Sequence, residues 1–575
     1  MKILLIYPPF LEQRLNTEDV GAVPMGLYYV AAAAMADGHS VEVLNWHDVN
    51  ARPDEIRRTL EHRRPDVIGF SVLHANRWGA LDIAATARRL LPGVRIVFGG
   101  IGATCLWRHF LTHFPQVDVV VLGEGEHTFL RLVQCYEKEG GQGLAQIPGI
   151  AFRHQGAPRR TAPAEPEADL DRLPPPSRYF TFSHVALTRG CPADCRFCGS
   201  PGFWGRRVRF HSSDYFVGQV RRLYGRGVRF FFVSDDTFTL NRRRVIAVCR
   251  RLAELGLDIG WAAISRVDTV DEEVLRWMRR AGCIQISYGV ESGSEEIRAR
   301  LGKRIRTADI RRAFSLTRRC GIMPRAYFIY GSPGETPQTI AASVELMNEI
   351  RPLSAIFYIL DLFPGTALYE EFRKRTGATD DIWLQRIEDI LYFETDPALS
   401  REQVLSFGRT LRSAFYNGLP GFVRSVELLD EPEFYPLHAD FLSRLGLTFD
   451  QGDYARIEAV ADKARLAEEL YRRALEYHPD ARAFLGLGIL HQKKQDYAGS
   501  VQWLRRGLEH FPGHEQLNLC LGISLLNLGQ AEEALACFLP FENSPQALRL
   551  AARCFEALGE PQKAKQYDAL AQSRR

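Results

Sequence analysis

Short apolar runs alternate with amphipathic stretches along residues 1–140 of the chain. The apolar runs fall at residues 3–6, 41–44, 67–70, 96–98 and 119–121. Between them lie segments with helical periodicity, such as residues 83–91. Runs of this length predict strands buried on both faces, and their alternation with helices predicts a parallel sheet covered by helices on each side.

Five strand–helix units predict an α/β fold of the doubly wound, flavodoxin-like type over residues 1–156, with a ligand crevice at the carboxyl ends of the strands. The proline-rich residues 157–177 are expected to form a linker. A second alternating region at residues 178–400 predicts a partial (β/α)6 TIM barrel. Its six apolar runs lie at residues 185–187, 230–233, 260–263, 284–287, 326–329 and 355–358.

From residue 401 onward the pattern is helical throughout. Residues 401–453 are expected to be a helical connector, and residues 454–575 an all-α region of tetratricopeptide-type repeats. The key places of one 34-residue unit are filled by Phe484, Leu487, Gly488, Ser500, Leu504, Gly507 and Pro512. Small residues at such places let paired helices approach closely, so the pattern predicts a helical array without identifying what it binds.

Composition is ordinary for a folded globular chain of 575 residues, with 25% charged residues and a net charge of +4. Such a balance gives no electrostatic argument for nucleic acid or an anionic membrane as a main partner. No apolar stretch is long enough to span a membrane, and the N-terminal apolar run reaches Pro8 and Pro9 too soon for a signal peptide. We therefore expect a cytoplasmic protein with reduced thiols.

Three cysteines, Cys191, Cys195 and Cys198, are grouped in the stretch TRGCPADCRFCGSPGFWG, and the other eight are scattered. A structural zinc site needs four ligands, usually as two pairs, and no second pair lies nearby. Three thiolates on one loop suit a cubic iron–sulfur cluster in which one iron has no protein ligand. The alternative is three incidental cysteines in a loop. The segment that follows, with Trp204, Arg206, Arg207 and Arg209, would suit an anionic substrate, but we expect an ordinary exposed basic segment with Trp204 packed beneath it.

A Cx3CxxC motif directly after the first strand of a six-unit barrel resembles the radical S-adenosylmethionine (SAM) enzymes. This resemblance implies a 4Fe–4S cluster whose open iron binds SAM, reductive cleavage of SAM to a 5′-deoxyadenosyl radical, and an electron donor such as flavodoxin or ferredoxin. It also implies SAM contacts at the carboxyl ends of later strands. The matching residues are Ser234, Asp235, Asp236, Arg266, Glu291, Ser292 and Gly331. Each of these alone would also fit a helix cap, and no catalytic side chain is assigned.

The first domain is similar to the cobalamin-binding domains fused to one branch of these enzymes. The resemblance is carried by three strand ends, and the candidate contacts in them are Ser71, Gly99, Gly100, Gly123 and Gly125. Glycine-rich turns would also fit a nucleotide-binding domain. The region from Tyr7 to Met25 lacks the histidine that many cobalamin domains place below cobalt, so the resemblance implies cobalt without that ligand.

Together these motifs favour a cobalamin-dependent radical SAM enzyme that methylates an unactivated carbon or phosphorus of a small-molecule, carrier-bound or protein-bound substrate. Two alternatives remain open: a cobalamin-linked radical cyclase or oxidoreductase, and a non-catalytic cobalamin or SAM sensor acting through its repeats. The methylthiolating enzymes of transfer RNA fit poorly, because a second cysteine triplet is missing. We expect the repeats to bind a protein partner or to mediate self-association.

Overall fold

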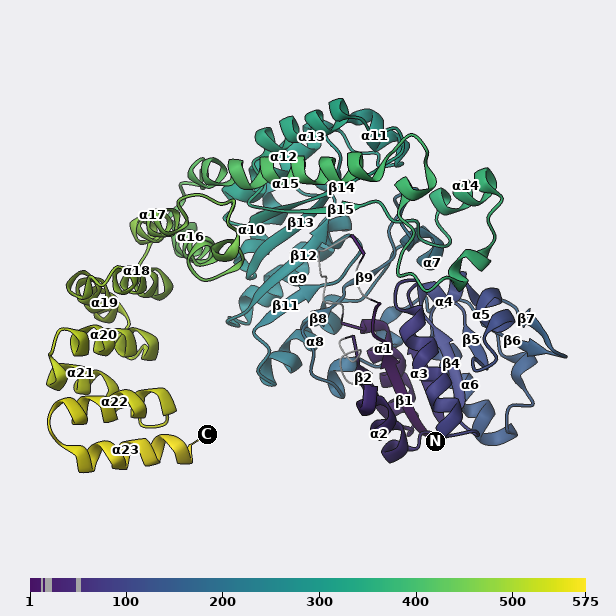
Figure 1. Cartoon of the computed structure of the whole chain (residues 1–575), viewed down its shortest axis with the longest axis horizontal. Helices are drawn as coiled ribbons and strands as arrows, with labels where there is room; N and C mark the ends of the chain where they lie inside the picture. Colours follow the sequence, from purple (N-terminus) through teal and green to yellow (C-terminus); the bar gives the residue numbers. More distant parts are fainter. Residues whose placement is uncertain (12–13, 16–22, 48–52, 575) are drawn as a thin grey trace. The chain divides into compact units, whose positions relative to one another are not determined.

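The computed structural model describes residues 1–11, 14–15, 23–47 and 53–574 (Figure 1). It divides into two compact units, the first comprising Met1–Ser315 and Pro324–Arg412, and the second comprising Leu316–Met323 and Ser413–Arg575. Among the described residues, no helix combines the length and apolar character needed to cross a membrane.

The first unit opens with a sheet of five parallel strands in the order β2-β1-β3-β4-β5, as the sequence predicts. Successive residues of β1 face opposite sides: Leu4 and Ile6 pack in one apolar core, and Ile3 and Leu5 in the other. Both faces are therefore buried, which explains the continuous apolar runs. The strands are β1 (Lys2–Tyr7), β2 (Ser40–Asn45), β3 (Val67–Ser71), β4 (Arg95–Gly99) and β5 (Val119–Val121). The helices are α1 (Met25–Ala36), α2 (Pro53–Arg63), α3 (Arg77–Leu90), α4 (Ile101–Cys105), α5 (Trp107–His113) and α6 (Glu126–Glu139).

Two further strands extend this sheet in antiparallel fashion, and the sequence analysis missed both. They are β6 (Ile150–His154) and β7 (Ala157–Arg160). The expected linker at residues 157–177 is therefore wrong at its start, because residues 157–160 belong to the sheet. Pro158 is compatible with a strand here because β7 is the last strand of the sheet, where one side of the backbone needs no partner.

The second sheet holds six strands in the order β15-β14-β13-β12-β11-β8, confirming the six predicted positions. Its two ends do not pair with each other, so the sheet is an open, partial barrel with helices between successive strands (Figure 1). The strands are β8 (His184–Val185), β11 (Phe230–Val233), β12 (Gly260–Ser265), β13 (Cys283–Glu291), β14 (Met323–Tyr330) and β15 (Ser354–Ile359). The helices are α8 (Ser213–Gly225), α9 (Arg242–Glu254), α10 (Glu272–Arg280), α11 (Glu295–Arg300), α12 (Thr307–Arg319), α13 (Pro337–Ile350) and α14 (Ala367–Thr376).

A small antiparallel pair, β9 (Thr188–Arg189) and β10 (Arg209–Phe210), brackets the cysteine loop. The loop between them carries the three cysteines and the short helix α7 (Ser200–Trp204). Strands of two residues leave no periodic pattern, so the sequence analysis did not find them. The pair fixes both ends of the loop next to the end of β8.

The second unit is helical, as expected. Its pairs pack through small residues: a Cβ added at Gly488 would lie 2.6 Å from Leu504, and one added at Gly522 would lie 2.4 Å from Phe538. The segment expected to be a helical connector, residues 401–453, is helical: it contains the long helix α15 (Arg401–Arg424) and the helix α16 (Tyr435–Asp450). Helix α16 packs on α17 (Lys463–Tyr477) and α18 (Ala481–Lys493). The remaining helices are α19 (Tyr497–His510), α20 (Glu515–Asn527), α21 (Ala531–Phe538), α22 (Pro545–Ala557) and α23 (Pro561–Ser573).

Candidate functional site

A cavity of about 600 Å³ in the first unit lies where the carboxyl ends of the first sheet meet the cysteine loop and the barrel. This volume is within the usual range for ligand pockets. Eight of the residues singled out from sequence line it: Ser71, Gly99, Gly100, Gly123, Gly125, Cys198, Ser234 and Asp236. The two sets of motifs, found separately along the chain, therefore share one cavity.

Glycines shape the wall that the first sheet contributes. Gly100 has a φ of +91°, and a Cβ there would lie 3.0 Å from the carbonyl oxygen of Val72. Gly102 approaches the backbone of the β3 loop even more closely, because its Cβ would lie 2.5 Å from the carbonyl carbon of Leu73. Only glycine fits such positions without moving the loops that form the wall.

The cavity extends between the strands of the first sheet and its covering helices as an apolar channel. A Cβ at Gly69 would lie 2.6 Å from Leu5, so the glycine lets the Leu5 side chain pack against β3 beside the channel. A glycine-lined mouth over an apolar channel fits a bulky nucleotide-bearing ligand such as cobalamin. Residues along the channel are Leu5, Leu27, Val30, Gly69, Val97, Val121 and Phe129. The segment from Tyr7 to Met25 holds no candidate histidine ligand for cobalt. It lies partly outside the described residues, at positions 12–13 and 16–22.

Cys191 and Cys195 lie close enough to Cys198 to act on the ionisation of its thiol. Burial raises the pKa of Cys195 and raises that of Cys198 to about 11. The positive charges of Lys303 and Arg266 act on Cys195 in the opposite direction. Thiols in this setting hold their protons at neutral pH unless a metal displaces them, so three grouped thiols fit an iron–sulfur cluster that releases protons on binding.

Asp235 and Asp236, adjacent at the end of β11, have different surroundings. The Asp235 carboxylate is 2% exposed and accepts hydrogen bonds from the backbone amides of Leu187, at 3.1 Å, and Thr188. Burial raises its pKa to about 7. Asp235 does not line the cavity, and its oxygens accept backbone hydrogen bonds, which favours a structural role ahead of the cysteine loop over the expected SAM contact.

Asp236 faces the cavity instead. Its Oδ2 accepts a hydrogen bond of 2.7 Å from the hydroxyl of Ser200, which follows the third cysteine by two residues. Burial raises the pKa of Asp236, and hydrogen bonds from Ser200 and the Gly190 amide oppose that rise. This carboxylate therefore joins the end of β11 to both sides of the cysteine loop.

Glu291 and Arg266 lie away from the cavity wall but near the cysteines. Glu291 has a φ of +64° and accepts a 2.7 Å hydrogen bond from Lys303, and both side chains are buried. Arg266 donates two hydrogen bonds to Asp268, at 3.0 and 2.8 Å. The pKa of Lys303 is raised although burial opposes its charge, because Glu291 and Cys195 favour the ammonium form. These charges surround Cys195.

Ser292 and Gly331 serve the packing of neighbouring elements. The Ser292 hydroxyl lies 3.3 Å from that of Ser343 on α13, and it also accepts the amide of Ser294. Gly331 has a φ of +74° and donates its amide to Glu335 in the turn after β14. Neither residue lines the cavity, and their expected contacts with SAM stay predictions.

A buried ion network that the sequence analysis missed joins the two halves of the first unit. Arg189 on β9 pairs with Glu124, at 2.9 Å, in the turn after β5, and with Glu126, the first residue of α6. Arg209 on β10 also pairs with Glu124 and is 7% exposed, so the expectation that it is exposed is wrong. The sequence does not show which charged residues pair when they lie far apart along the chain, although the stretch GEGE at residues 123–126 indicated a turn.

A second connection across the cavity was also missed. Nε2 of His74, on the loop after β3, lies 2.9 Å from Oδ2 of Asp361, just beyond β15. His74 lines the cavity and packs against the ring of Phe363, with centroids 4.7 Å apart. A lone histidine after Ser71-Val72-Leu73 gives no signal without its partner 287 residues later. This pair places a titratable group in the cavity wall.

Comparison with known proteins agrees with this arrangement. The family model of the B12 binding domain matches residues 20–133, that of the radical SAM superfamily residues 185–347, and that of the tetratricopeptide repeat residues 455–515. An uncharacterized methyltransferase of Pyrococcus horikoshii is 31% identical over 382 residues, covering 64% of this chain and 83% of that protein.

Two further similarities bear on the site. An anaerobic magnesium-protoporphyrin IX monomethyl ester cyclase of Cereibacter sphaeroides is 27% identical over 404 residues, covering 66% of this chain and 65% of the cyclase. The structure of the radical SAM methyltransferase TsrM from Kitasatospora setae, with cobalamin and a 4Fe–4S cluster bound, aligns with a TM-score of 0.58 at 18% identity. That alignment covers 83% of this chain and 99% of TsrM and shows a shared fold.

Proposed function

Because the chain belongs to the radical SAM enzymes that carry an N-terminal cobalamin-binding domain, we propose that it methylates an unactivated carbon or a phosphorus atom of its substrate. A 4Fe–4S cluster, SAM and cobalamin are the cofactors of this enzyme. The observation that carries the proposal is the single cavity lined both by the glycine turns of the first sheet and by Cys198.

In this proposal the chain's own residues bind and orient the cofactors. The thiolates of Cys191, Cys195 and Cys198 hold the cluster, and the residues at the ends of β3, β4 and β5 hold cobalamin. The cluster supplies one electron to SAM, and cobalamin carries a methyl group. Asp236 and Ser234 bind the methionyl part of SAM, while Lys303, Glu291 and Arg266 set the charge around Cys195. The apolar wall excludes water from a reactive radical.

A cyclase or other radical oxidoreductase is the second candidate, supported by the 27% identity to the magnesium-protoporphyrin cyclase. The two candidates share every motif considered above, so the site alone does not separate them. His74 would serve either reaction as the proton-accepting group in the cavity wall, with Asp361 fixing its ring.

The products formed from SAM distinguish a methylase from a cyclase. Anaerobic protein reconstituted with the cluster and cobalamin would be given SAM and a reductant, and the small products measured. A methylase forms both S-adenosylhomocysteine and 5′-deoxyadenosine, whereas a cyclase forms 5′-deoxyadenosine without S-adenosylhomocysteine. Failure to form either product, with cluster and cobalamin both loaded, would contradict both candidates. A Cys198→Ala variant is the control for background cleavage.

The repeats and the redox partner complete the proposal. A tetratricopeptide array presents a groove suited to a protein segment, which supports recruitment of a protein or a carrier-bound substrate, or self-association. The electron donor is proposed to be a flavodoxin or ferredoxin. No nucleic-acid partner is proposed, because the net charge is only +4 over 575 residues.

A further inference from the structure

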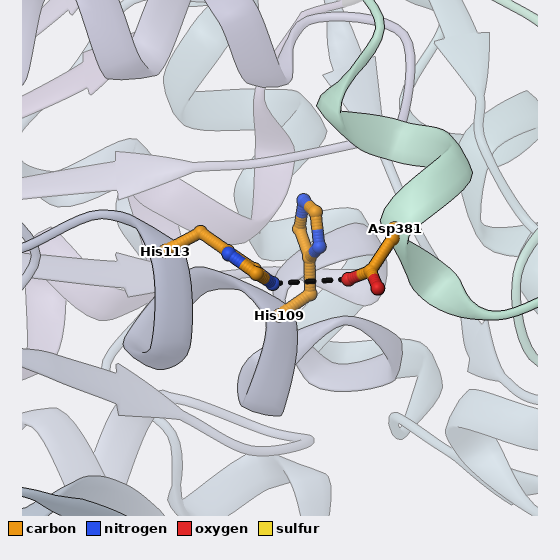
Figure 2. A group of neighbouring side chains, drawn as sticks. All are labelled: His109, His113 and Asp381. Atoms are coloured by element: carbon orange, nitrogen blue, oxygen red, sulfur yellow. Dashed lines mark hydrogen bonds and ion pairs between the residues drawn. The ribbon is translucent and has the colours of Figure 1, made fainter.

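Two histidines and an aspartate converge at one point of the first unit, outside the cavity. His109 and His113 lie one turn apart on α5, and Asp381 comes from the short helix η7 (Asp380–Leu384) that follows α14 (Figure 2). One ligand atom from each of the three lies within 4.8 Å of the others. Figure 2 shows the His113 ring pointing at the Asp381 carboxylate, with the His109 ring beside this contact.

The contacts of His109 are unusual for a buried histidine. Its side chain is 3% exposed, and neither ring nitrogen has a hydrogen-bond partner among the described residues. A buried polar atom without a partner is unfavourable, because it has lost its hydrogen bonds to water. His113 and Asp381 contact each other, because Nε2 of His113 lies 3.0 Å from Oδ1 of Asp381. Both side chains are accessible to solvent. An ion at this point would satisfy His109 and leave a solvent-facing position.

We propose that His109, His113 and Asp381 bind a divalent zinc ion, with water as the fourth ligand. Imidazole nitrogens and carboxylate oxygens lie about 2.0–2.2 Å from zinc, which sets neighbouring ligand atoms roughly 3–3.5 Å apart. The His113–Asp381 separation already meets this spacing. The other ligand atoms lie within 4.8 Å of one another, and rotation of the surface side chains of His113 and Asp381 brings them to this spacing.

Charge around the site is compatible with a cation. Arg77, whose positive charge acts on His109, donates its guanidinium hydrogens to backbone carbonyls, including those of His74 and Gln385. Asp381 supplies a negative charge, and two neutral imidazoles complete a ligand set suited to zinc and similar first-row cations. This site shares no residue with the lining of the cavity, so the proposal does not depend on the reaction the enzyme performs.

The proposed ion would fasten the segment after the barrel to the first domain. Trp383, in the same short helix as Asp381, is fully buried and contacts His74 at a ring separation of 5.8 Å. Arg77 lies over the Trp383 ring at 4.6 Å. Fixing Asp381 to α5 would therefore hold the segment that backs the His74 wall of the cavity.

The test measures zinc bound to the full chain with its cluster loaded, because empty cysteines would themselves bind zinc. After anaerobic reconstitution and dialysis against a zinc buffer, elemental analysis counts zinc and iron separately. We expect one zinc per wild-type chain. Asp381→Asn and His113→Gln should each weaken zinc affinity at least a hundredfold, beyond the roughly 10- to 100-fold cost of losing an outer-shell partner.

His127→Ala is the matched control. His127 also hydrogen-bonds a carboxylate, that of Glu167 at 3.1 Å, but the described residues place no third ligand beside it. The measurement is repeated in a chain with the three loop cysteines changed to alanine, where zinc should still bind once. Wild-type chain that binds no more zinc than Asp381→Asn, in both backgrounds, overturns the proposal. So does an unchanged affinity in both site variants.

Discussion

The guanidinium of Arg189 and the carboxylate of Glu126 form a buried ion pair, with side chains 8% and 6% exposed. Burial opposes ionisation of Glu126, yet the charge and hydrogen bond of Arg189 hold its pKa below the usual range. Arg189 directly precedes the cysteine loop, and Glu126 begins α6 of the first sheet's domain. The pair thus ties the predicted cluster site to the predicted cobalamin site.

Removing Arg189 should destabilise the first unit. Arg189→Met leaves the buried Glu126 without its partner, while Glu124 keeps Arg209, and breaking a buried pair in this way costs about 3–5 kcal/mol. Thermal unfolding measures the loss, and cobalamin retention after gel filtration should fall with it. Arg251→Ala is the control, because the Arg251–Asp214 pair is exposed and worth about 1 kcal/mol or less. Equal effects from both substitutions would contradict the assigned role.

Replacing Cys191, Cys195 or Cys198 with alanine should abolish the cluster's visible absorption and all reductive cleavage of SAM. The reason is that two thiolates cannot hold a cubic cluster with one open iron. Iron content and 5′-deoxyadenosine formation are the measurements. Cys249→Ala should leave both unchanged, since Cys249 is fully buried in the core packing of α9. A single-alanine loop variant with normal product formation would refute the ligand assignment.

Asp236 and its neighbour Asp235 should differ in their effect on SAM binding. Asp236→Ala removes a carboxylate from the cavity wall, and losing one charge-assisted hydrogen bond of about 2 kcal/mol corresponds to roughly 30-fold weaker binding. Asp235→Asn keeps an oxygen that accepts from the Leu187 and Thr188 amides, so SAM affinity should change little. Anaerobic calorimetry on cluster-loaded protein measures both. The reverse ranking would return the SAM contact to Asp235.

Glu335 predicts a dependence of stability on pH. Its side chain is 4% exposed, and burial raises its pKa to about 7 despite amide hydrogen bonds from Gly331 and Ser332. The folded state therefore keeps a proton that the unfolded chain releases near pH 4.5. Its contribution to stability is complete below that pH and is lost as pH rises through about 7.

Glu335→Gln replaces the titrating carboxyl group with an amide that stays uncharged. The stability of the variant should therefore depend less on pH than that of the wild type. The shift corresponds to a contribution on the order of 3 kcal/mol at its largest. Unfolding temperatures of wild type and variant at pH 5 and pH 8 give the comparison: the wild type should lose stability across this interval relative to the variant. Parallel profiles would mean that Glu335 titrates normally in the folded protein.

The strands of the two sheets were predictable because most of their residues are apolar, and all eleven predicted runs overlap a strand. The orientation of polar residues at strand ends was not predictable. Adjacent residues of a strand point to opposite sides, so Asp235 and Asp236 carry the same sequence signal and different surroundings. Pairs such as Arg189 with Glu126 join residues 63 positions apart, and their charges alone do not specify partners. The short strands β9 and β10 offer no period to detect.

The helical array should be dispensable for cofactor chemistry. Every residue lining the cavity precedes α15. A cut after Pro479 falls between helix pairs, leaving α16 packed on α17, whereas a cut near residue 450 would strip α16 of its partner. We expect the shortened chain to load cluster and cobalamin and to form 5′-deoxyadenosine at the full-length rate without substrate.

If the array recruits a protein or a carrier-bound molecule, the shortened chain should fail to turn over the physiological substrate. The comparison uses full-length protein reconstituted in parallel, with product formation measured on both free and carrier-bound substrate. Loss of activity only on the carrier-bound form supports recruitment. If the shortened chain is equally active on the free and the carrier-bound substrate, the array has another task, such as self-association. Sedimentation of the shortened and full-length chains would reveal self-association. Precipitation or loss of the cluster after truncation would place the array in the core fold and contradict its independence.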